Sequence, residues 1–219
     1  MVGATAHGGW WRPRLGSWWM GVLFALGAAC FAVAAVPGVV TVVGSGPDAV
    51  VYFVGSVFFT TAAAIQWRLT EGHGALWWGS AIQFVGTILF NVNTFRAMQS
   101  GLDAHEYDRL VWTPDVLGCI CFLVSGWIAF AAVRSARATS AQERRWRIAA
   151  VNLAGCVAFA VAAIGGYVVP RNGDTLSLAA ANGFTCLGGL CFLVGAVLGL
   201  AADAAEQDGA APADVVAER

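Results

Sequence analysis

A long run without a charge, ALWWGSAIQFVGTILFNVNTF at positions 75–95, constrains this chain more than any other feature. A helix of roughly 20 apolar residues spans the hydrocarbon core of a bilayer, where no water is present to satisfy an exposed backbone. Uncharged runs of similar length recur at 18–36, 49–67, 116–133, 148–169 and 176–201. The chain is therefore predicted to be an all-α, polytopic integral membrane protein with six transmembrane helices.

The amino-acid composition limits the class of protein and the covalent chemistry that the chain can perform. Hydrophobic residues make up 58% of the chain and charged residues 11%, a balance far from that of soluble domains. All twelve basic side chains are arginine, so none can form a Schiff base with retinal, pyridoxal phosphate or a carbonyl substrate. The charges sum to −1 and lie almost wholly between the apolar runs, which indicates a lipid bilayer as the partner and no nucleic acid. No cofactor is predicted.

Every cysteine lies in an apolar run, where this residue behaves as a small hydrophobic side chain. On a helix Cys119 and Cys121 point about 200° apart, and the chain contains no CxxC pair. A packing role is therefore favoured, while a redox or metal role remains the alternative. The six residues are Cys30, Cys119, Cys121, Cys156, Cys186 and Cys191.

The apolar runs divide the chain into three parts. Residues 1–17 mix tryptophan with arginine, as the membrane–water interface prefers, and are predicted to be a cytoplasmic interfacial segment. Residues 202–219 are acidic and rich in alanine, and they are predicted to be disordered. Between them, residues 18–201 form the predicted transmembrane domain of three helical hairpins, 18–67, 75–133 and 148–201.

The arginines predict the orientation. Six spans place both termini on one side, and with that side cytoplasmic the inner segments hold nine arginines against three outside. Because cytoplasmic segments carry an excess of basic residues, both termini are predicted to be cytoplasmic. The outer three are Arg96, Arg109 and Arg171.

Short words recur along the chain and suggest an internal repeat. In the odd-numbered spans a glycine precedes a phenylalanine by four residues at Gly27 and Phe31, Gly86 and Phe90, and Gly155 and Phe159. In the even-numbered spans similar words begin, at equal intervals along the chain, at Phe53, Leu123 and Leu193. Three parallel repeats of a helical hairpin, related by an axis along the membrane normal, are therefore predicted.

One of these words carries a resemblance to a family. The phrase YFVGSVFF at 52–59, with echoes at 84–90 and 191–195, resembles the helix motif of the YrhK-like domain, a small bacterial two-helix membrane module of unknown function. The whole chain resembles uncharacterised six-span membrane proteins of actinobacteria. The resemblance implies a bacterial cytoplasmic (plasma) membrane location and a hairpin architecture, and it supplies no activity or site.

A polar stripe runs down the third span, within an arc of about 80° on one helix face. It consists of Ser80, Gln83, Thr87, Asn91 and Thr94. Other polar side chains in the spans are Asn93, Asn152, Asn182 and Thr185. Such groups form interhelical hydrogen bonds or line a pore for a small neutral solute, and the sequence leaves both interpretations open.

Catalysis finds little support. No ionisable residue is expected inside a span, which disfavours proton relays and carboxylate-coupled transport. The chain has no GxSxG or HExxH motif, so no catalytic residue is predicted. The connection 96–113 contains an acidic, histidine-bearing stretch, for which a solvated loop is favoured over a metal site: Asp103, His105, Glu106 and Asp108.

The connection 134–147 is the most basic part of the chain and is predicted to contact anionic lipid or a protein partner. Its arginines are Arg134, Arg137, Arg144, Arg145 and Arg147. An accessory or scaffolding membrane protein is therefore the first functional hypothesis. The alternative is a passive conduit or facilitator for a small neutral solute along the third helix, and an intramembrane thiol enzyme is third. Gly195-xxx-Gly199 suits either a contact within the chain or a homo-oligomer.

Overall fold

The computed structural model describes residues 13–99, 101–134 and 139–209. The prediction of an all-α protein with six helices long and apolar enough to cross a membrane is confirmed. These are α1 (Pro13–Ala34), α3 (Ser45–Leu69), α4 (Ala75–Ala97), α6 (Thr113–Val133), α7 (Ser140–Gly165) and α8 (Leu178–Gly209). Short elements are α2 (Val39–Val43), α5 (Ala104–Tyr107) and the π-helical turn η1 (Asp108–Trp112).

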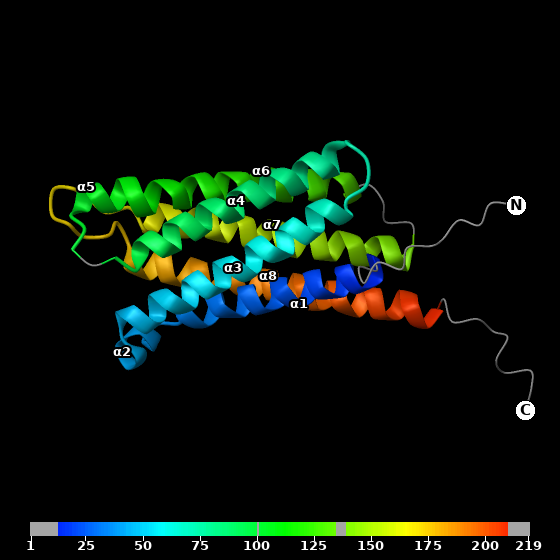
Figure 1. Cartoon of the computed structure of the whole chain (residues 1–219), viewed down its shortest axis with the longest axis horizontal. Helices are drawn as coiled ribbons and strands as arrows, with labels where there is room; N and C mark the ends of the chain where they lie inside the picture. The colour runs from blue at the N-terminus through cyan, green and yellow to red at the C-terminus, as the bar shows by residue number, and fades with distance from the viewer. Residues whose placement is uncertain (1–12, 100, 135–138, 210–219) are drawn as a thin grey trace, which may run out of the picture.

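The six long helices form a closed ring in chain order. Each packs against the helix before it and the helix after it, and α8 packs against α1 to complete the circle. Figure 1 shows the helices side by side along one axis. We call the end where α1 begins and α8 ends the proximal end, and the end that carries α2 and α5 the distal end. An even number of spans places the start of α1 and the end of α8 together.

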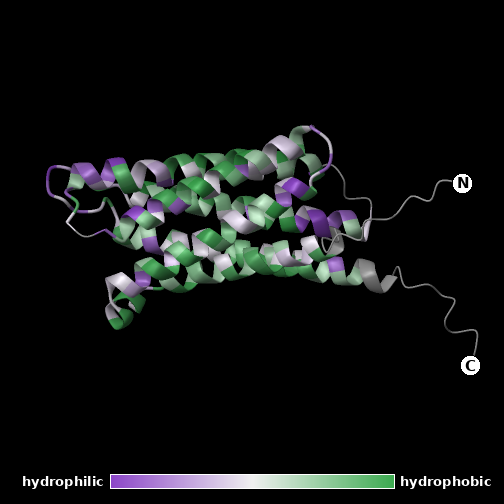
Figure 2. Ribbon diagram, in the orientation of Figure 1, coloured by the Kyte–Doolittle hydropathy of each residue, from purple (hydrophilic) through white to green (hydrophobic). Residues whose placement is uncertain are grey.

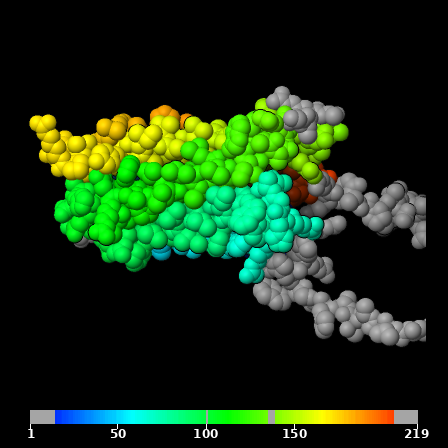
Figure 3. All heavy atoms as spheres, turned by 90° about the horizontal axis from the view of Figure 1, so that it is seen from above, coloured from blue at the N-terminus to red at the C-terminus, as the bar shows by residue number. Residues whose placement is uncertain are grey.

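The outer surface suits a lipid environment. Large apolar side chains such as Val33, Ile164 and Val197 are more than half exposed on the sides of the bundle. In Figure 2 hydrophilic residues gather toward the two ends of the bundle, and most of the ribbon between them is hydrophobic. On the face shown in Figure 3, side chains close the gaps between neighbouring helices.

The connection 96–113 is a correction to the sequence analysis, because most of it is helical. Asp103 caps α5: its Oδ1 accepts a hydrogen bond from the Glu106 amide at 2.8 Å, and the Glu106 carboxylate accepts one from the Asp103 amide. This capping box satisfies backbone donors that a helix start otherwise leaves unpaired. The helical segment then passes through η1 into α6, so that Ala104–Val133 forms one continuous candidate span.

Two other boundaries differ from the prediction. A second capping box, between Thr139 and Gln142, starts α7 at Ser140, well before the predicted span. Arg144, Arg145 and Arg147 therefore lie on a helix and not in a loop. At the other end α8 continues to Gly209, so residues 202–209 are helical and the prediction of disorder is wrong there. Residues 210–219, and 1–12 of the interfacial segment, lie outside the described residues.

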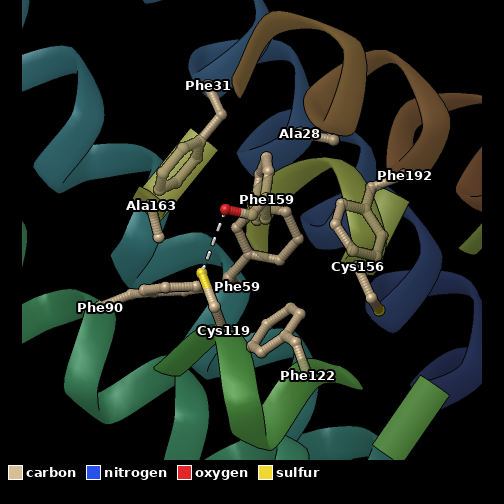
Figure 4. Packing of buried hydrophobic residues seen from close by; sticks show 10 residues of the cluster. All are labelled: Ala28, Phe31, Phe59, Phe90, Cys119, Phe122, Cys156, Phe159, Ala163 and Phe192. Carbon is tan, nitrogen blue, oxygen red and sulfur yellow. Dashed lines mark hydrogen bonds between the residues drawn. The ribbon is translucent and has the colours of Figure 1, made fainter. Parts of the chain in front are cut away.

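Six phenylalanines, one from each long helix, meet on the axis of the bundle (Figure 4). We call them the phenylalanine cluster: Phe31, Phe59, Phe90, Phe122, Phe159 and Phe192. Ring centroids within Phe31, Phe90 and Phe159 lie 5.7–6.4 Å apart, and those within Phe59, Phe122 and Phe192 lie 5.8–6.3 Å apart. These two triangles are stacked along the axis.

Each hairpin supplies one ring to each triangle. The paired rings lie 5.5 Å apart between α1 and α3, 5.0 Å between α4 and α6, and 5.2 Å between α7 and α8. Aromatic pairs at such separations contribute about 0.5–1.5 kcal/mol beyond the burial of their area. The cluster therefore ties the three hairpins to one another as well as closing each of them.

A glycine four residues before each of the six phenylalanines lets the helices of a hairpin approach closely. A Cβ atom on Gly86 would lie 3.2 Å from the carbonyl oxygen of Gly118, and one on Gly118 would lie 3.2 Å from that of Gly86. Gly155 and Gly188 show the same reciprocal contact at 3.2 Å. Small residues at helix crossings are what allows tight packing where water supplies no hydrophobic drive.

The arrangement changes the alignment of the even-numbered helices. The word match aligns Phe53 with Leu123. The cluster instead aligns Phe59 with Phe122, two residues that are closer together in the sequence than Phe53 and Leu123. The first even helix is therefore shifted by about two helical turns relative to the alignment predicted from the words. The threefold arrangement of rings favours three hairpins of one design, and the sequence repeat itself stays a prediction.

Candidate functional site

Two partly open cavities lie on the bundle axis, one on each side of the phenylalanine cluster. The distal cavity has a volume of about 300 Å³ and reaches the rings of Phe31, Phe90 and Phe159. The proximal cavity also has a volume of about 300 Å³ and reaches Phe122 and Phe192. Phe59 lines neither cavity and is 1% exposed. The six rings thus separate two cavities of the same size.

Polar side chains of four long helices, and Tyr107 of α5, line the distal cavity. The Asn93 amide of α4 donates a hydrogen bond from Nδ2 to Oδ1 of Asp115 on α6, at 2.6 Å. Further polar groups are Asp48, Tyr52, Thr94, Asn182 and Thr185. A bond of this length is at the short end for an N–H···O hydrogen bond. It holds the Asp115 carboxylate at the cavity wall.

Asp48 lies in the first turn of α3, where Gly44 precedes the helix with a φ of 88°. The carboxylate lines the distal cavity and is 8% exposed, and its Oδ1 has no hydrogen-bond partner among the described residues. An acidic group in the first turn of a helix gains about 0.3–1 kcal/mol from the helix dipole. Burying an ion costs several kcal/mol, so the position alone does not account for an unpaired carboxylate.

Two pairs of hydrogen-bonded polar side chains line the proximal cavity. The Ser17 hydroxyl of α1 donates to Oδ2 of Asp203 on α8. The Ser125 hydroxyl donates to Oε1 of Gln83 at 3.5 Å, the outer limit of a hydrogen bond. Asn152 of α7 lies so close to Gly195 that a Cβ atom at that position would overlap its Oδ1. The described carboxylate of this cavity therefore has a partner, in contrast to Asp48.

The polar stripe of α4 is chiefly the seam between α4 and α3. Ser80, Thr87 and Thr94 are buried, each two turns after the last. The Ser80 hydroxyl donates to the Leu76 carbonyl at 2.9 Å and also contacts the Thr70 hydroxyl at 3.1 Å. The Thr87 hydroxyl donates to the Phe84 carbonyl at 2.6 Å. These three side chains therefore form hydrogen bonds within the protein.

The remaining stripe residues extend this seam. Asn91 donates from Nδ2 to the Thr60 hydroxyl at 2.8 Å, while its buried Oδ1 has no partner among the described residues. The Thr94 and Ser56 hydroxyls lie 2.9 Å apart. Thr94 reaches the distal cavity and Gln83 the proximal one. Five residues that share one face by helical spacing thus divide between a helix seam and two cavities.

The other predicted polar residues all line a cavity. Asn93, Asn182 and Thr185 line the distal cavity, and Asn152 lines the proximal one. Gly195 and Gly199 also line the proximal cavity. The Gly-xxx-Gly pattern of α8 therefore faces the bundle interior and not the outer surface that a second copy would contact.

The described members of the predicted basic group lie at the proximal end. Arg134 is exposed after the end of α6, and Arg144, Arg145 and Arg147 lie in the first turns of α7. Arg147 donates from Nη2 to Oε1 of the exposed Glu143 at 2.5 Å. Arg137 lies outside the described residues. A juxtamembrane group of arginines at one end of the bundle follows.

Comparisons with known proteins give a plain result. No family model, curated protein or solved structure matches this chain. The resemblance to the YrhK-like domain and to six-span proteins of actinobacteria therefore stays a prediction.

The cysteines show packing contacts. Cys119 and Cys156 are buried beside the phenylalanine cluster, and the Cys119 thiol donates to the Phe159 carbonyl at 3.4 Å. All six are free thiols. Among residues 13–99, 101–134 and 139–209, no group of three histidine, cysteine or acidic side chains is arranged to hold a metal ion.

Sequence reasoning missed the three carboxylates that line the two cavities. Asp48, Asp115 and Asp203 lie within the candidate spans, so the prediction of spans without ionisable residues is wrong at the helix ends. Asp48 follows a Gly-rich turn and Asp115 follows Pro114. Both patterns are typical of a helix start, and recognising them would have extended the two spans to include the carboxylates.

Proposed function

We propose that this protein provides a gated path for small polar solutes along the axis of its helix bundle. The observation that carries the proposal is the pair of polar-lined cavities that meet the same phenylalanine cluster from opposite ends. The sides of the bundle are apolar, and the polar groups face its interior, where they are available to a solute on the axis. Solute sites in bundles of parallel repeats lie at the repeat interface, on such an axis.

The phenylalanine cluster is the gate in this proposal. Apolar constrictions block water and solutes by excluding water from a narrow section. Phe59 is the ring to test, because it lines neither cavity and is 1% exposed, and its centroid lies 5.5–6.3 Å from those of Phe31, Phe122 and Phe192. The cluster is closed in this structure, and passage requires its rings to move apart.

This path differs from the one expected from sequence. The conduit hypothesis used the polar stripe of α4, but most of that stripe is hydrogen-bonded to α3 or to its own helix. Gln83 and Thr94 contribute because they reach the cavities. The bundle axis, and not one helix face, is therefore the route to test.

Flux through the purified protein in liposomes tests the gate. The Phe59→Ala variant is expected to raise the uptake of methylammonium, urea or glycerol by about an order of magnitude, because it removes a fully buried ring from an apolar constriction. Stopped-flow light scattering reports the neutral solutes, and a pH-sensitive dye reports methylammonium.

The control separates gating from general loosening of the bundle. The control variant Phe184→Ala also removes a phenyl ring, but from α8, at a position that is 37% exposed and lines neither cavity. Phe59→Leu keeps apolar volume if the alanine variant does not fold. The proposal is rejected if folded Phe59 variants are no more permeable than protein-free liposomes to all three solutes.

The orientation and location are part of the proposal. Described arginines at the proximal end are Arg14, Arg68, Arg134, Arg144, Arg145 and Arg147, and those at the distal end are Arg96, Arg109 and Arg171. The asymmetry supports a cytoplasmic proximal end, and the membrane that we propose is a bacterial plasma membrane. Cysteine reporters at positions 171 and 134 test it, since outside reagents are expected to label the first and not the second.

The basic proximal end supports a second function, as an accessory or scaffolding protein that holds anionic lipid or a protein partner. Arg144 and Arg147 lie near the membrane surface on α7, where each basic residue adds about 1 kcal/mol of attraction to anionic lipid. Native mass spectrometry is expected to show less retained phosphatidylglycerol after Arg144→Ala with Arg147→Ala. Arg171→Ala, at the exposed distal end, is the control, and equal retention in all three proteins rejects this function.

A further inference from the structure

We infer that the distal cavity is a binding site for a small organic ammonium ion, with Asp48 as its principal acceptor and Asp115 as the second carboxylate. The inference deepens the proposed function, on which it rests for the claim that the bound ion is also a solute of the path. Binding itself is measured separately from flux.

The first argument is the unused oxygen of Asp48. This side chain is 8% exposed, it lines the cavity, and its Oδ1 has no hydrogen-bond partner among the described residues. Buried polar atoms in folded proteins almost always have partners, and this oxygen is fully buried, so a ligand donor reaches it when the Asp48 side chain turns toward the cavity. The helix N-terminus beside it offsets part of the burial of a charge and leaves this oxygen unbonded.

The second argument is the charge of the cavity wall. Asp48 and Asp115 both line it, and none of the described lining side chains is basic. Asp115 accepts a hydrogen bond from the Asn93 amide, which orients its side chain and brings no positive charge to the cavity. A ligand that brings positive charge and N–H donors therefore complements the site better than a neutral solute.

The third argument is the aromatic lining. Tyr52, Tyr107 and Trp112 line the cavity above the rings of the distal triangle, Phe31, Phe90 and Phe159. Faces of aromatic rings attract organic cations, and they also pack against an alkyl chain. A metal ion is disfavoured because the described residues offer no group of three ligating side chains. A volume of about 300 Å³ suits an ammonium ion with a short organic chain.

Isothermal titration of the full-length protein in detergent tests the site with butylammonium. Butan-1-ol, which has the same chain length without the charge, and butyrate, which has the opposite charge, are the matched probes. Butylammonium is expected to bind at least about tenfold more tightly than butan-1-ol, and butyrate is expected not to bind. This comparison needs no variant, and equal binding of butylammonium and butan-1-ol overturns the inference.

Asp48→Asn tests the residue, because it keeps the shape and removes the charge. Its affinity for butylammonium is expected to fall by about tenfold or more. Its thermal stability without ligand is expected to equal or exceed that of the native protein, since an unpaired buried charge is lost. Asp103→Asn is the control: Asp103 is exposed at the same end, and asparagine also caps a helix. A native-like affinity in Asp48→Asn, or a large loss of stability, assigns Asp48 a structural role and overturns the inference.

Flux and binding separate the two proposals. If butylammonium binds in an Asp48-dependent way and no Phe59 variant increases flux, the site stands and the gated path fails. If the Phe59 variants conduct and butylammonium neither binds nor permeates, the path stands and the ammonium site fails.

Discussion

The two cavities have the same volume, about 300 Å³, and both end at rings of the phenylalanine cluster. They differ in how their carboxylates are paired. In the proximal cavity the Asp203 carboxylate accepts a hydrogen bond from the Ser17 hydroxyl. In the distal cavity Asp48 keeps an oxygen without a partner among the described residues. Size therefore does not distinguish a binding site from a vestibule here, and the pairing of the carboxylates does.

The difference arises from where each carboxylate sits along its helix. Asp48 and Asp115 lie in the first turns of α3 and α6, at the distal end. Asp203 lies near the end of α8, beside the beginning of α1. A helix start favours negative charge and a helix end does not, so the distal end tolerates Asp48, a carboxylate with an oxygen that has no partner among the described residues.

The largest effect is expected from the rings that floor the cavities. Phe90→Ala and Phe122→Ala should each lower the free energy of unfolding by about 3–5 kcal/mol, because both side chains are buried in the phenylalanine cluster. Denaturation in mixed detergent measures the loss, and Phe184→Ala is the control. Butylammonium affinity should change in Phe90→Ala and not in Phe122→Ala. Equal changes would show that the cavities are not separate sites.

A smaller effect is expected from the amides that face the carboxylates and hydroxyls. Asn93→Leu removes a donor 2.6 Å from the Asp115 carboxylate and should lower the free energy of unfolding by about 2 kcal/mol. Gln83→Leu removes an acceptor 3.5 Å from the Ser125 hydroxyl and should lower it by less than about 0.5 kcal/mol. Each variant changes one cavity: Asn93→Leu the distal cavity and Gln83→Leu the proximal one. Similar losses of unfolding free energy would contradict the contrast between a strongly and a weakly bonded amide.

A loss of about 1 kcal/mol is expected when the proximal cavity is overpacked by Gly195→Ala. The new Cβ would overlap Oδ1 of Asn152, whose side chain has room to turn into the cavity. Adding Asn152→Ala should remove the overlap, so that Gly195→Ala costs no stability in that background, and a double-mutant cycle measures this. Gly183→Ala, with nothing within 4 Å of the new atom, is the control. An equal loss with and without Asn152 would place the strain elsewhere.

The smallest effect is expected outside both cavities. Arg147→Ala breaks a pair with Glu143 in which the two side chains are 65% and 52% exposed. An exposed pair of this kind contributes at most about 0.5 kcal/mol, and salt weakens it further. Thermal unfolding in low and high salt measures it. A loss comparable to that of Asn93→Leu would mean that the basic segment stabilises the bundle and does not serve only as a contact surface.

Much of the fold is predictable from the chain. The lengths of the apolar runs predict six membrane-spanning helices, because the bilayer thickness sets the length of a span. Gly27 and Phe31, with the matching pairs in the other odd helices, already carry the spacing that builds the phenylalanine cluster. Helix starts are harder to predict, because capping boxes at Asp103 and Thr139 extend helices into polar sequence that hydropathy excludes.

The candidate site could be predicted only in part. Helical spacing places Asn93 off the polar stripe, and this side chain indeed lines the distal cavity rather than joining the seam with α3. Its partner Asp115 lies on α6, the second helix of the same hairpin. Helical spacing within α4 does not predict which residues of α6 it contacts. Hydropathy assigns Asp48 to a turn and Asp203 to a tail, since a short polar segment next to an apolar run looks the same whether it ends outside or folds into a cavity.

The sequence by itself determined that the chain crosses a membrane, how many times it does so, and which side chains are small or aromatic at regular intervals. Only the tertiary structure decided which of those side chains meet. Helical spacing fixes the direction of a residue around its own axis, but the crossing of six helices decides whether that direction ends in lipid, in a seam or in a cavity. That is why five residues of one stripe serve different surroundings, and why the unpaired oxygen of Asp48 emerges only once the ring of helices is closed.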